Sequence, residues 1–286
     1  MIAPDGPDRR GQIQPAPRDA PLPASWDGLR RRLRSAPMLY PPGPRPAGTS
    51  PPPAAAASCI ICRGPVRPGF ARCYQCGRHA LLGRSLLADA VVPISYAIRG
   101  TAYADDLWRY KSWLAPSASA RTSVLALLLA FLNDHGPCVW RHAAMPPPDC
   151  LAVVPTGCGR PGSHPLLRLV SPYLRLPLSS LAIRPGSQGR DLDLNRFQAS
   201  QMPAGASVLL LDDSWVSGAS AQSSAGALRL AGAGHVAIIV LGRHVNPADP
   251  RAAPLIARLA PACYDASSCA VHPAAGAAGL GRPSPK

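Results

Sequence analysis

Short apolar runs alternate with helical patterns through the second half of the chain. The runs predict strands at 150–154, 178–183, 207–211 and 236–241, and the patterns predict helices at 165–174 and 219–231. Further upstream, helical spacing predicts helices at 102–113 and 122–133, and the apolar stretch 86–98, which contains Pro93, predicts an edge strand or a hairpin. This order predicts an α/β fold, a parallel sheet flanked by helices.

The loops that follow three of these strands are the expected place for chemistry. Ligands of parallel α/β sheets bind beyond the carboxyl ends of the strands. The candidate loops are therefore 155–164, 212–220 and 242–247.

Composition divides the chain into four parts. The 286 residues include 36 Pro and 25 Gly, so parts of the chain are expected to lack order. We predict a disordered Pro/Arg-rich leader at 1–57, a cysteine module at 58–80, the α/β domain at 86–247, and a C-terminal extension at 248–286 whose end is disordered.

The net charge of +15 would ordinarily indicate a polyanionic partner. Because Lys111 and Lys286 are the only lysines, we interpret the charge as a compositional drift towards arginine. The apolar run 124–132 is shorter than the roughly 20 residues of a membrane span, and the start of the chain lacks the pattern of a secretory signal. We therefore predict a cytoplasmic protein without a membrane span.

The cysteine module contains two CxxC hooks. Four thiolates in paired hooks suit a tetrahedral zinc ion, and a glycine behind each hook, Gly64 and Gly77, would let the backbone turn. Two disulfides or free thiols are the alternatives. We predict a structural zinc ribbon with His79 as a bystander; the ligands are Cys59, Cys62, Cys73 and Cys76.

The stretch 208–220 is the most informative part of the sequence. Four apolar residues lead into Asp212 and Asp213, and a turn with Gly218 between Ser217 and Ser220 then opens a helix. Backbone amides, hydroxyls and the positive end of the helix dipole would suit a phosphate, and the two carboxylates would suit the paired hydroxyls of a sugar. The alternative is a strand end followed by a serine-capped helix.

This stretch resembles the phosphoribosyl-diphosphate (PRPP) motif of the type I phosphoribosyltransferases. The resemblance implies that Asp212 and Asp213 bind the ribose hydroxyls. It also implies that the 5-phosphate is surrounded by Val216, Ser217, Gly218, Ala219 and Ser220. Val216 and the bulky Trp215 depart from the usual motif.

The resemblance extends to the ComF-like branch, which joins a four-cysteine zinc module to this fold. The matching features are Tyr110-Lys111, Val154-Pro155 and a polar hood segment at 190–197. It implies that the loop after the first central strand receives the diphosphate, through Thr156, Gly157 and Arg160. It also implies a lid that carries Arg190 and Arg196; the alternative for both segments is a solvated loop.

The implied function is phosphoribosyl transfer. PRPP would bind with Mg²⁺ and lose diphosphate, and a nitrogen nucleophile of an unknown base or amine would attack the ribose. The alternative from another class is a PRPP- or nucleotide-binding module without turnover, which serves single-stranded DNA handling or the competence machinery.

Rival motifs are weaker. Residues 157–162 also fit GxGxxG, but Pro161 and Pro165 disturb the turn, and Arg184 stands where a dinucleotide fold needs an acid. We find neither a P-loop nor a GxSxG elbow. We expect Cys138, Cys150 and Cys158 to be small buried hydrophobic residues. We expect His135 to lie in a loop or at the surface, and Cys263 and Cys269 to lie near a flexible end of the chain. His244 is a candidate for facing the ligand.

Overall fold

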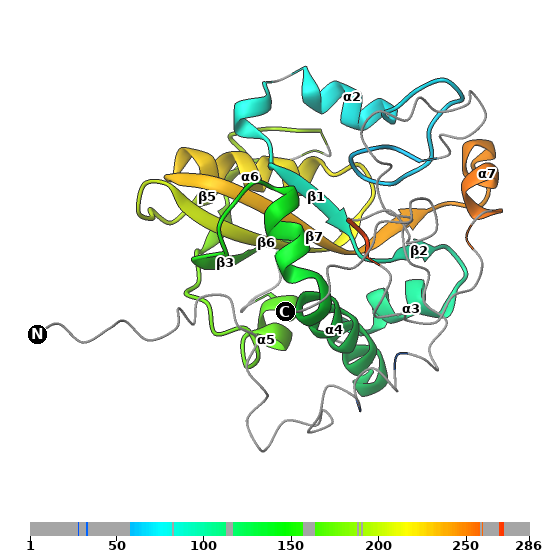
Figure 1. The fold of residues 1–286 in the computed structure, drawn as a ribbon, viewed down its shortest axis with the longest axis horizontal. Coiled ribbons are helices and arrows are strands. Elements are labelled where there is room, and N and C mark those ends of the chain that lie inside the picture. The colour runs from blue at the N-terminus through cyan, green and yellow to red at the C-terminus, as the bar shows by residue number, and fades with distance from the viewer. Residues whose placement is uncertain are drawn as a thin grey trace, which may run out of the picture.

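The computed structural model describes Gly28, Leu33 and residues 58–81, 83–112, 117–156, 164–187, 189, 191–257, 259 and 269–271. A mostly parallel central sheet lies between two layers of helices (Figure 1). The α/β class and the parallel sheet flanked by helices are therefore confirmed. Disorder was predicted for 1–57 and for the end of 248–286. Almost all of these residues lie outside the part of the chain that the structure describes.

Four strands form the body of the sheet in the order β1-β7-β6-β3, and β2 also pairs with β7. Their bounds are β1 Ala90–Pro93, β2 Tyr96–Ile98, β3 Cys150–Val153, β6 Ala206–Trp215 and β7 Ala233–Val245. All these pairings are parallel, and Leu211 of β6 lies opposite Val153 and Ile239. The carboxyl ends of β3, β6 and β7 consequently lie beside one another at one edge.

The stretch 86–98 forms an edge and no hairpin. After the short 3-10 helix Arg84–Leu86, β1 and β2 follow each other along the same side of β7. Pro93 ends β1 at this outer position, where a missing N–H does not interrupt the sheet. Between the two strands, the Ser95 hydroxyl donates a hydrogen bond of 2.8 Å to the Leu241 carbonyl oxygen.

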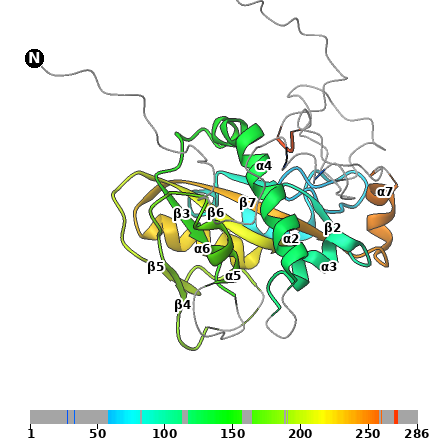
Figure 2. The same cartoon turned by 90° about the horizontal axis from the view of Figure 1, so that it is seen from below.

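Each face of the sheet has its own apolar cluster. The first contains Leu209 and Leu211 and packs under α3 Ala102–Arg109, α4 Ala118–His142 and α5 Pro165–Val170 (Figure 2). The second contains Val208 and Leu210 and packs under α6 Ala219–Leu230 and the cysteine module with its helix α2 Tyr74–Ala80. This alternation follows from the two-residue period of a strand. Leu33 joins the first cluster.

Helix α4 is longer than the predicted 122–133, because it continues through Pro137 to His142. His135, expected in a loop or at the surface, is 7% exposed because the continuing helix carries it into the core. By length and composition α4 passes the test for a membrane span, but 72% of its most apolar window is buried inside the protein. Burial in the core accounts for its apolar composition.

Strands β6 and β7 also exceed their predicted lengths. We expected Asp212 and Asp213 to end the strand, and this is wrong: β6 continues to Trp215, since β7 runs beside it with Asp212 opposite Val240 and Ser214 opposite Gly242. The predicted strand 178–183 is divided, because Leu178 bridges to Leu151 of the main sheet, whereas β4 Leu181–Ile183 pairs antiparallel with β5 Phe197–Ala199. The described chain continues through η2 Pro250–Ala252 and α7 Ala253–Ile256.

Candidate functional site

Asp213 is held by two side chains that follow α3. The Tyr110 hydroxyl donates a hydrogen bond of 2.6 Å to Asp213 Oδ2, and Lys111 Nζ donates one of 2.8 Å to the same oxygen. Burial alone would raise the pKa of Asp213, but the Lys111 charge and these two hydrogen bonds lower it below its usual value. The Tyr110-Lys111 pair, which the sequence singled out without a role, thus anchors an ionised carboxylate.

Asp212 is the contrasting member of the pair. Its side chain is half-buried, and Oδ1 accepts a long hydrogen bond of 3.5 Å from the Ser214 amide. Burial and, second, the charge of Asp213 raise the pKa of the Asp212 carboxyl. A cation or a pair of hydroxyl donors placed at Asp212 would favour its ionised form, so the pair is suited to such a ligand.

The loop after β6 is shaped by Trp215. Its side chain is 1% exposed, and an added Cβ at Gly218 would lie 2.0 Å from the indole. Gly218 also has φ +81°, a backbone conformation that favours glycine. Helix α6 starts directly afterwards, and Ser217 Oγ accepts a hydrogen bond of 3.3 Å from the Ala219 amide. The unusual tryptophan therefore packs beneath the turn.

The other predicted residues of this loop surround the same turn. Val216 is 71% exposed, Ser217 and Ser220 are half-buried, and Gly218 and Ala219 are buried. The first amides of α6 carry the positive end of its dipole, which favours an anion. The structure thus brings the acidic pair and a helix start together over nine residues, 212–220.

The loop after β3 begins at the same edge. The Val154 amide donates a hydrogen bond of 2.9 Å to the Leu211 carbonyl oxygen, so the chain leaves β3 beside the residue that precedes Asp212, and Thr156 follows two residues later. The charge of His164, where the chain re-enters the described part, contributes to lowering the pKa of Asp213. Gly157 and Arg160 lie outside the described residues.

The expected lid packs against α6 in this structure. The Asp193 amide donates a hydrogen bond of 2.9 Å to Ser223 Oγ. Arg196 Nη1 donates one of 2.8 Å to the Gly189 carbonyl oxygen, and its guanidinium lies 5.3 Å from the Phe197 ring centroid. Arg190 lies outside the described residues, so closure by either arginine remains a prediction.

Arg243 of β7 is a site residue that the sequence analysis missed. Its buried Nη1 donates hydrogen bonds of 2.9 Å to the Trp215 carbonyl oxygen and 2.5 Å to that of His244. An added Cβ at Gly64 would lie 2.0 Å from Arg243 Nη2. The guanidinium therefore joins the cysteine module to the end of β6. The available signal was the position of this arginine within 242–247, one of the three segments in which the sequence predicts chemistry.

His244, a candidate for facing the ligand, is half-buried beside this arginine. Burial lowers the pKa of its imidazole, and the charges of Lys111 and Arg243 lower it further. These effects favour the neutral imidazole, and the charge of Asp213 acts in the opposite direction.

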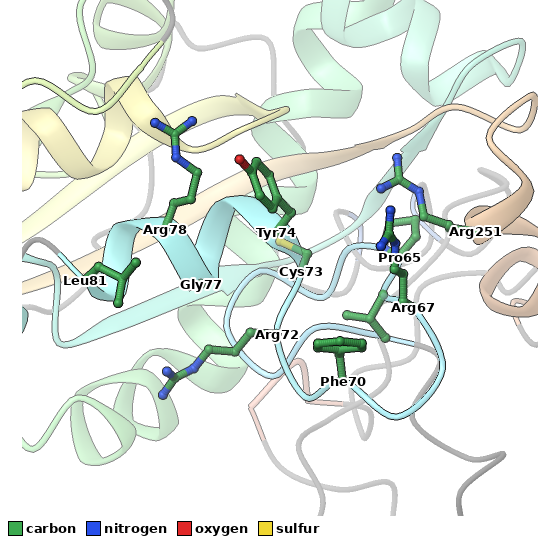
Figure 3. A pocket seen from close by; sticks show the side chains of 11 residues that line it. Pro65, Arg67, Phe70, Arg72, Cys73, Tyr74, Gly77, Arg78, Leu81 and Arg251 are labelled. Atoms are coloured by element: carbon green, nitrogen blue, oxygen red, sulfur yellow. The ribbon is translucent and has the colours of Figure 1, made fainter.

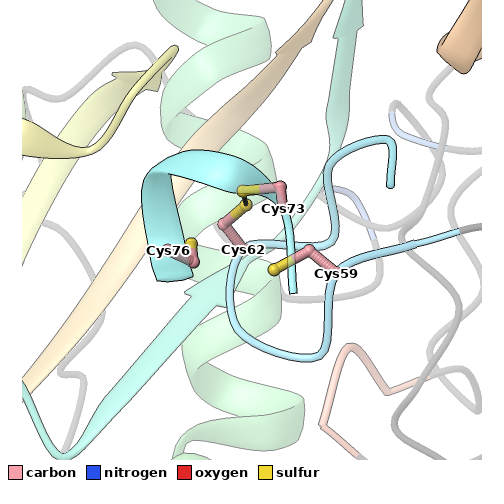
Figure 4. A group of neighbouring side chains, drawn as sticks. All are labelled: Cys59, Cys62, Cys73 and Cys76. Carbon is pink, nitrogen blue, oxygen red and sulfur yellow. Dashed lines mark hydrogen bonds between the residues drawn. The ribbon is translucent and has the colours of Figure 1, made fainter. Parts of the chain in front are cut away.

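The four hook cysteines converge as predicted (Figure 4). Their sulfur atoms lie within 4.8 Å of one another, and Sγ of Cys62 lies 3.7 Å from Sγ of Cys73. Tetrahedral zinc with bonds of about 2.3 Å requires sulfur pairs about 3.8 Å apart. All four are free cysteines, so the alternative of two disulfides does not describe this arrangement. The cluster fits a structural metal, and His79 lies outside it.

The two hook glycines do not act as expected. The left-handed residue of the first hook is Arg63, with φ 57°, and its carbonyl oxygen accepts a hydrogen bond of 2.9 Å from the Tyr96 hydroxyl. Gly64 follows it and is required by the approach of Arg243. Gly77 is inside α2, because the second hook enters a helix.

Neither the models of known protein families nor the curated proteins give a match to this chain. Its function must therefore be inferred from the residues and their geometry.

Asp212→Asn should stabilise the ligand-free protein at neutral pH. The fold raises the pKa of the Asp212 carboxyl. At any pH above about 4, where the carboxyl ionises in the unfolded chain, ionisation therefore favours the unfolded state. Each unit of difference between the folded and unfolded pKa corresponds to about 1.4 kcal/mol. We expect a gain of about that size or more in the free energy of unfolding by urea at pH 7. The gain should vanish below about pH 4, where both states are protonated.

Asp213→Asn should have the opposite effect. The lowered pKa of Asp213 contributes stability. This stability is present at a pH above the pKa of the carboxyl in the unfolded chain, and it is lost as the pH falls through the pKa in the folded protein. The substitution should therefore cost about 1–3 kcal/mol at pH 7, and less on acidification. Changes of the same sign for the two variants at pH 7 would contradict this description of the pair.

Gly64→Ala should break the link through Arg243. The new methyl group would displace the guanidinium from the Trp215 carbonyl oxygen, and we expect a loss of about 1–3 kcal/mol in urea unfolding of the metal-loaded protein. Gly77→Ala is the matched control, because an added Cβ there meets nothing within 4 Å and the residue is helical. Equal losses in both variants would exclude a specific role for the contact.

Proposed function

We propose that this chain is a type I phosphoribosyltransferase-like protein of the ComF-like branch that binds PRPP at the carboxyl end of β6. The observation that carries the proposal is the succession of Asp212, Asp213 and a glycine-serine turn at the start of α6. A ribose 5-phosphate has a matching succession of paired hydroxyls and a phosphate. The carboxylates accept hydrogen bonds from the hydroxyls, and the turn binds the phosphate.

The two carboxylates have different tasks in this proposal. Asp213, fixed by Tyr110 and Lys111, is a rigid acceptor for one hydroxyl. Asp212 has a raised pKa and becomes ionised when the ligand brings hydroxyl donors and a cation. Asp212 and Asp213 would lie beside Mg²⁺ bound with PRPP, and the cation would reduce the negative charge of the pair.

The reaction would be transfer of phosphoribose to a nitrogen nucleophile. The bond from the ribose anomeric carbon to the diphosphate oxygen breaks, diphosphate leaves with the electron pair, and the nucleophile forms the new carbon–nitrogen bond. Asp212 and Asp213 offset the positive charge that develops on the ribose ring. Thr156, Gly157 and Arg160 would hold the diphosphate, and Arg190 and Arg196 would cover it.

An acceptor has room beside the phosphate turn. A cavity of about 680 Å³ is lined by Val216 of the turn, by His244 and Asn246 at the end of β7, and by Tyr74 of the cysteine module. A volume of this size is typical of small-molecule sites. The cavity favours the catalytic reading, because a module that only binds PRPP needs no second subsite.

The cysteine module has a structural role in this proposal. Cys59, Cys62, Cys73 and Cys76 supply four thiolates to zinc and leave no open position for a water molecule. A segment of this length is too short for a core of its own, so a metal would stabilise it.

A groove on the module supports a second function, the binding of single-stranded nucleic acid (Figure 3). Phe70 and Tyr74 line this cavity of about 680 Å³ and are 60% and 71% exposed. Four arginines line it as well: Arg67, Arg72, Arg78 and Arg251. The Arg78 guanidinium lies 5.8 Å from the Tyr74 ring centroid. Exposed aromatic rings among cationic groups are typical of platforms for unpaired bases.

Calorimetric titration with PRPP and Mg²⁺ tests the first function. We expect wild type to bind and Asp212→Asn to lose about tenfold to a hundredfold in affinity, since a hydrogen bond to a charged group contributes about 1.5–3 kcal/mol. Asp212→Asn is the sharpest variant because it should fold at least as stably as wild type. Release of diphosphate with pooled bases and amines then separates an enzyme from a binding module.

Asp134→Asn is the matched control for this titration. Asp134 is on α4, about 20 Å along the helix from Arg121, which contacts the Tyr110 carbonyl oxygen. It should leave PRPP affinity unchanged. Absence of binding by folded wild type, or equal binding by wild type and Asp212→Asn, would contradict the assignment of the pocket.

Binding of a fluorescent oligothymidylate tests the second function. Phe70→Ala and Tyr74→Ala should each weaken binding by about 1–3 kcal/mol, and Arg72→Gln should reduce its dependence on salt. Trp108→Ala removes another exposed ring, on α3, and is the control. An equal loss for Trp108→Ala, or no loss for the module variants, would refute a platform at this groove.

A further inference from the structure

A second group of metal-ligating side chains lies on the α4 side of the sheet, away from the cysteine module. His135 and Cys138 come from α4, and Cys269 comes from the described segment 269–271. The ligand atoms of all three lie within 4.8 Å of one another. We propose that these residues bind a divalent transition metal of the zinc class, which holds the C-terminal segment against α4.

The helix presents two of the ligands on one face. His135 and Cys138 are three residues apart, a spacing at which side chains of a helix are neighbours. One imidazole and two thiolates form a soft, tetrahedral donor set that suits zinc and excludes the oxygen-seeking magnesium and calcium. A tetrahedral metal would require ligand atoms about 3.5–3.8 Å apart, which small side-chain rotations supply from the present separations.

The sulfur atoms have donors suited to thiolates. The Val271 amide donates a hydrogen bond to Cys269 Sγ at 3.4 Å, and Arg141 Nη2 donates one to Cys138 Sγ at 3.8 Å. Both contacts bring positive charge density to the sulfur, and an outer shell of this kind orients metal ligands and reduces their charge. Cysteines that were packed only as apolar side chains would not require hydrogen-bond donors at their sulfur atoms.

The third ligand is placed by core packing. Ala270 and Val271, which follow Cys269, are each 3% exposed and belong to the same apolar cluster as α4. The cysteine is therefore held near α4 before any metal binds. Three protein ligands leave the fourth tetrahedral position for a water molecule or a further side chain, an arrangement unlike that of the four-cysteine module.

Cobalt titration of the reduced full-length chain tests the proposal. Co²⁺ reports tetrahedral thiolate sites by its visible absorption. We expect Cys138→Ser and Cys269→Ser each to bind one equivalent less than wild type, with the lost absorption being that of a mixed nitrogen and sulfur site. The difference in bound Co²⁺ between wild type and these variants does not depend on the hook cysteines, because they are intact in every variant. It does not depend on PRPP binding either.

The control is Cys150→Ser, which removes a half-buried thiol at the start of β3 and should leave the number of equivalents unchanged. His135→Asn should shift the absorption of the second site or abolish it, and circular dichroism checks that each variant folds. Equal metal content in wild type and in folded Cys138→Ser and Cys269→Ser would overturn the proposal. A Cys138–Cys269 disulfide that forms without reductant and resists metal loading would also overturn it.

Discussion

The buried guanidinium of Arg243 is the contact on which the assembly of the site depends. Arginine keeps its charge at any accessible pH, so a buried guanidinium must find acceptors within the fold. It finds them in the carbonyl oxygens of Trp215 and His244, while Gly64 leaves the space that it fills. The end of β6, the end of β7 and the first cysteine hook must therefore be in place together. A disturbance of the hook would reach the proposed phosphate turn through the Arg243 side chain.

The acidic pair shows the cost of such a site. Tyr110 and Lys111 stabilise Asp213, but the same negative charge makes ionisation of the neighbouring Asp212 unfavourable. A fold selected for stability alone would not place two carboxylates here. An unfavourable ionisation of this kind is typical of sites where a ligand completes the charge balance, and it supports the proposed binding of a ligand at the pair.

Local sequence patterns predicted much of the fold and of the candidate site. The features that they did not predict depend on contacts between residues far apart in the sequence. The hooks and the 208–220 stretch are contiguous, so their spacing alone indicates a cysteine cluster and an acidic turn before a helix. Asp213 and Lys111 are 102 residues apart, and Arg243 and Trp215 are 28 apart; no local period joins either pair. The same reason explains why β6 continues past its acids, since pairing with β7 decides its length.

The cavity beside Val216 connects the module to the proposed chemistry. Tyr74 and Gln75 lie directly before Cys76, and together with His244 and Asn246 they line the space where an acceptor would bind. A metal that fixes the hooks consequently also fixes one wall of that space, although four cysteine ligands leave it no catalytic position. Structural and substrate-selecting roles of the module would then be inseparable, because Tyr74, the first residue of α2, lies between the ligands Cys73 and Cys76 and would face the proposed acceptor.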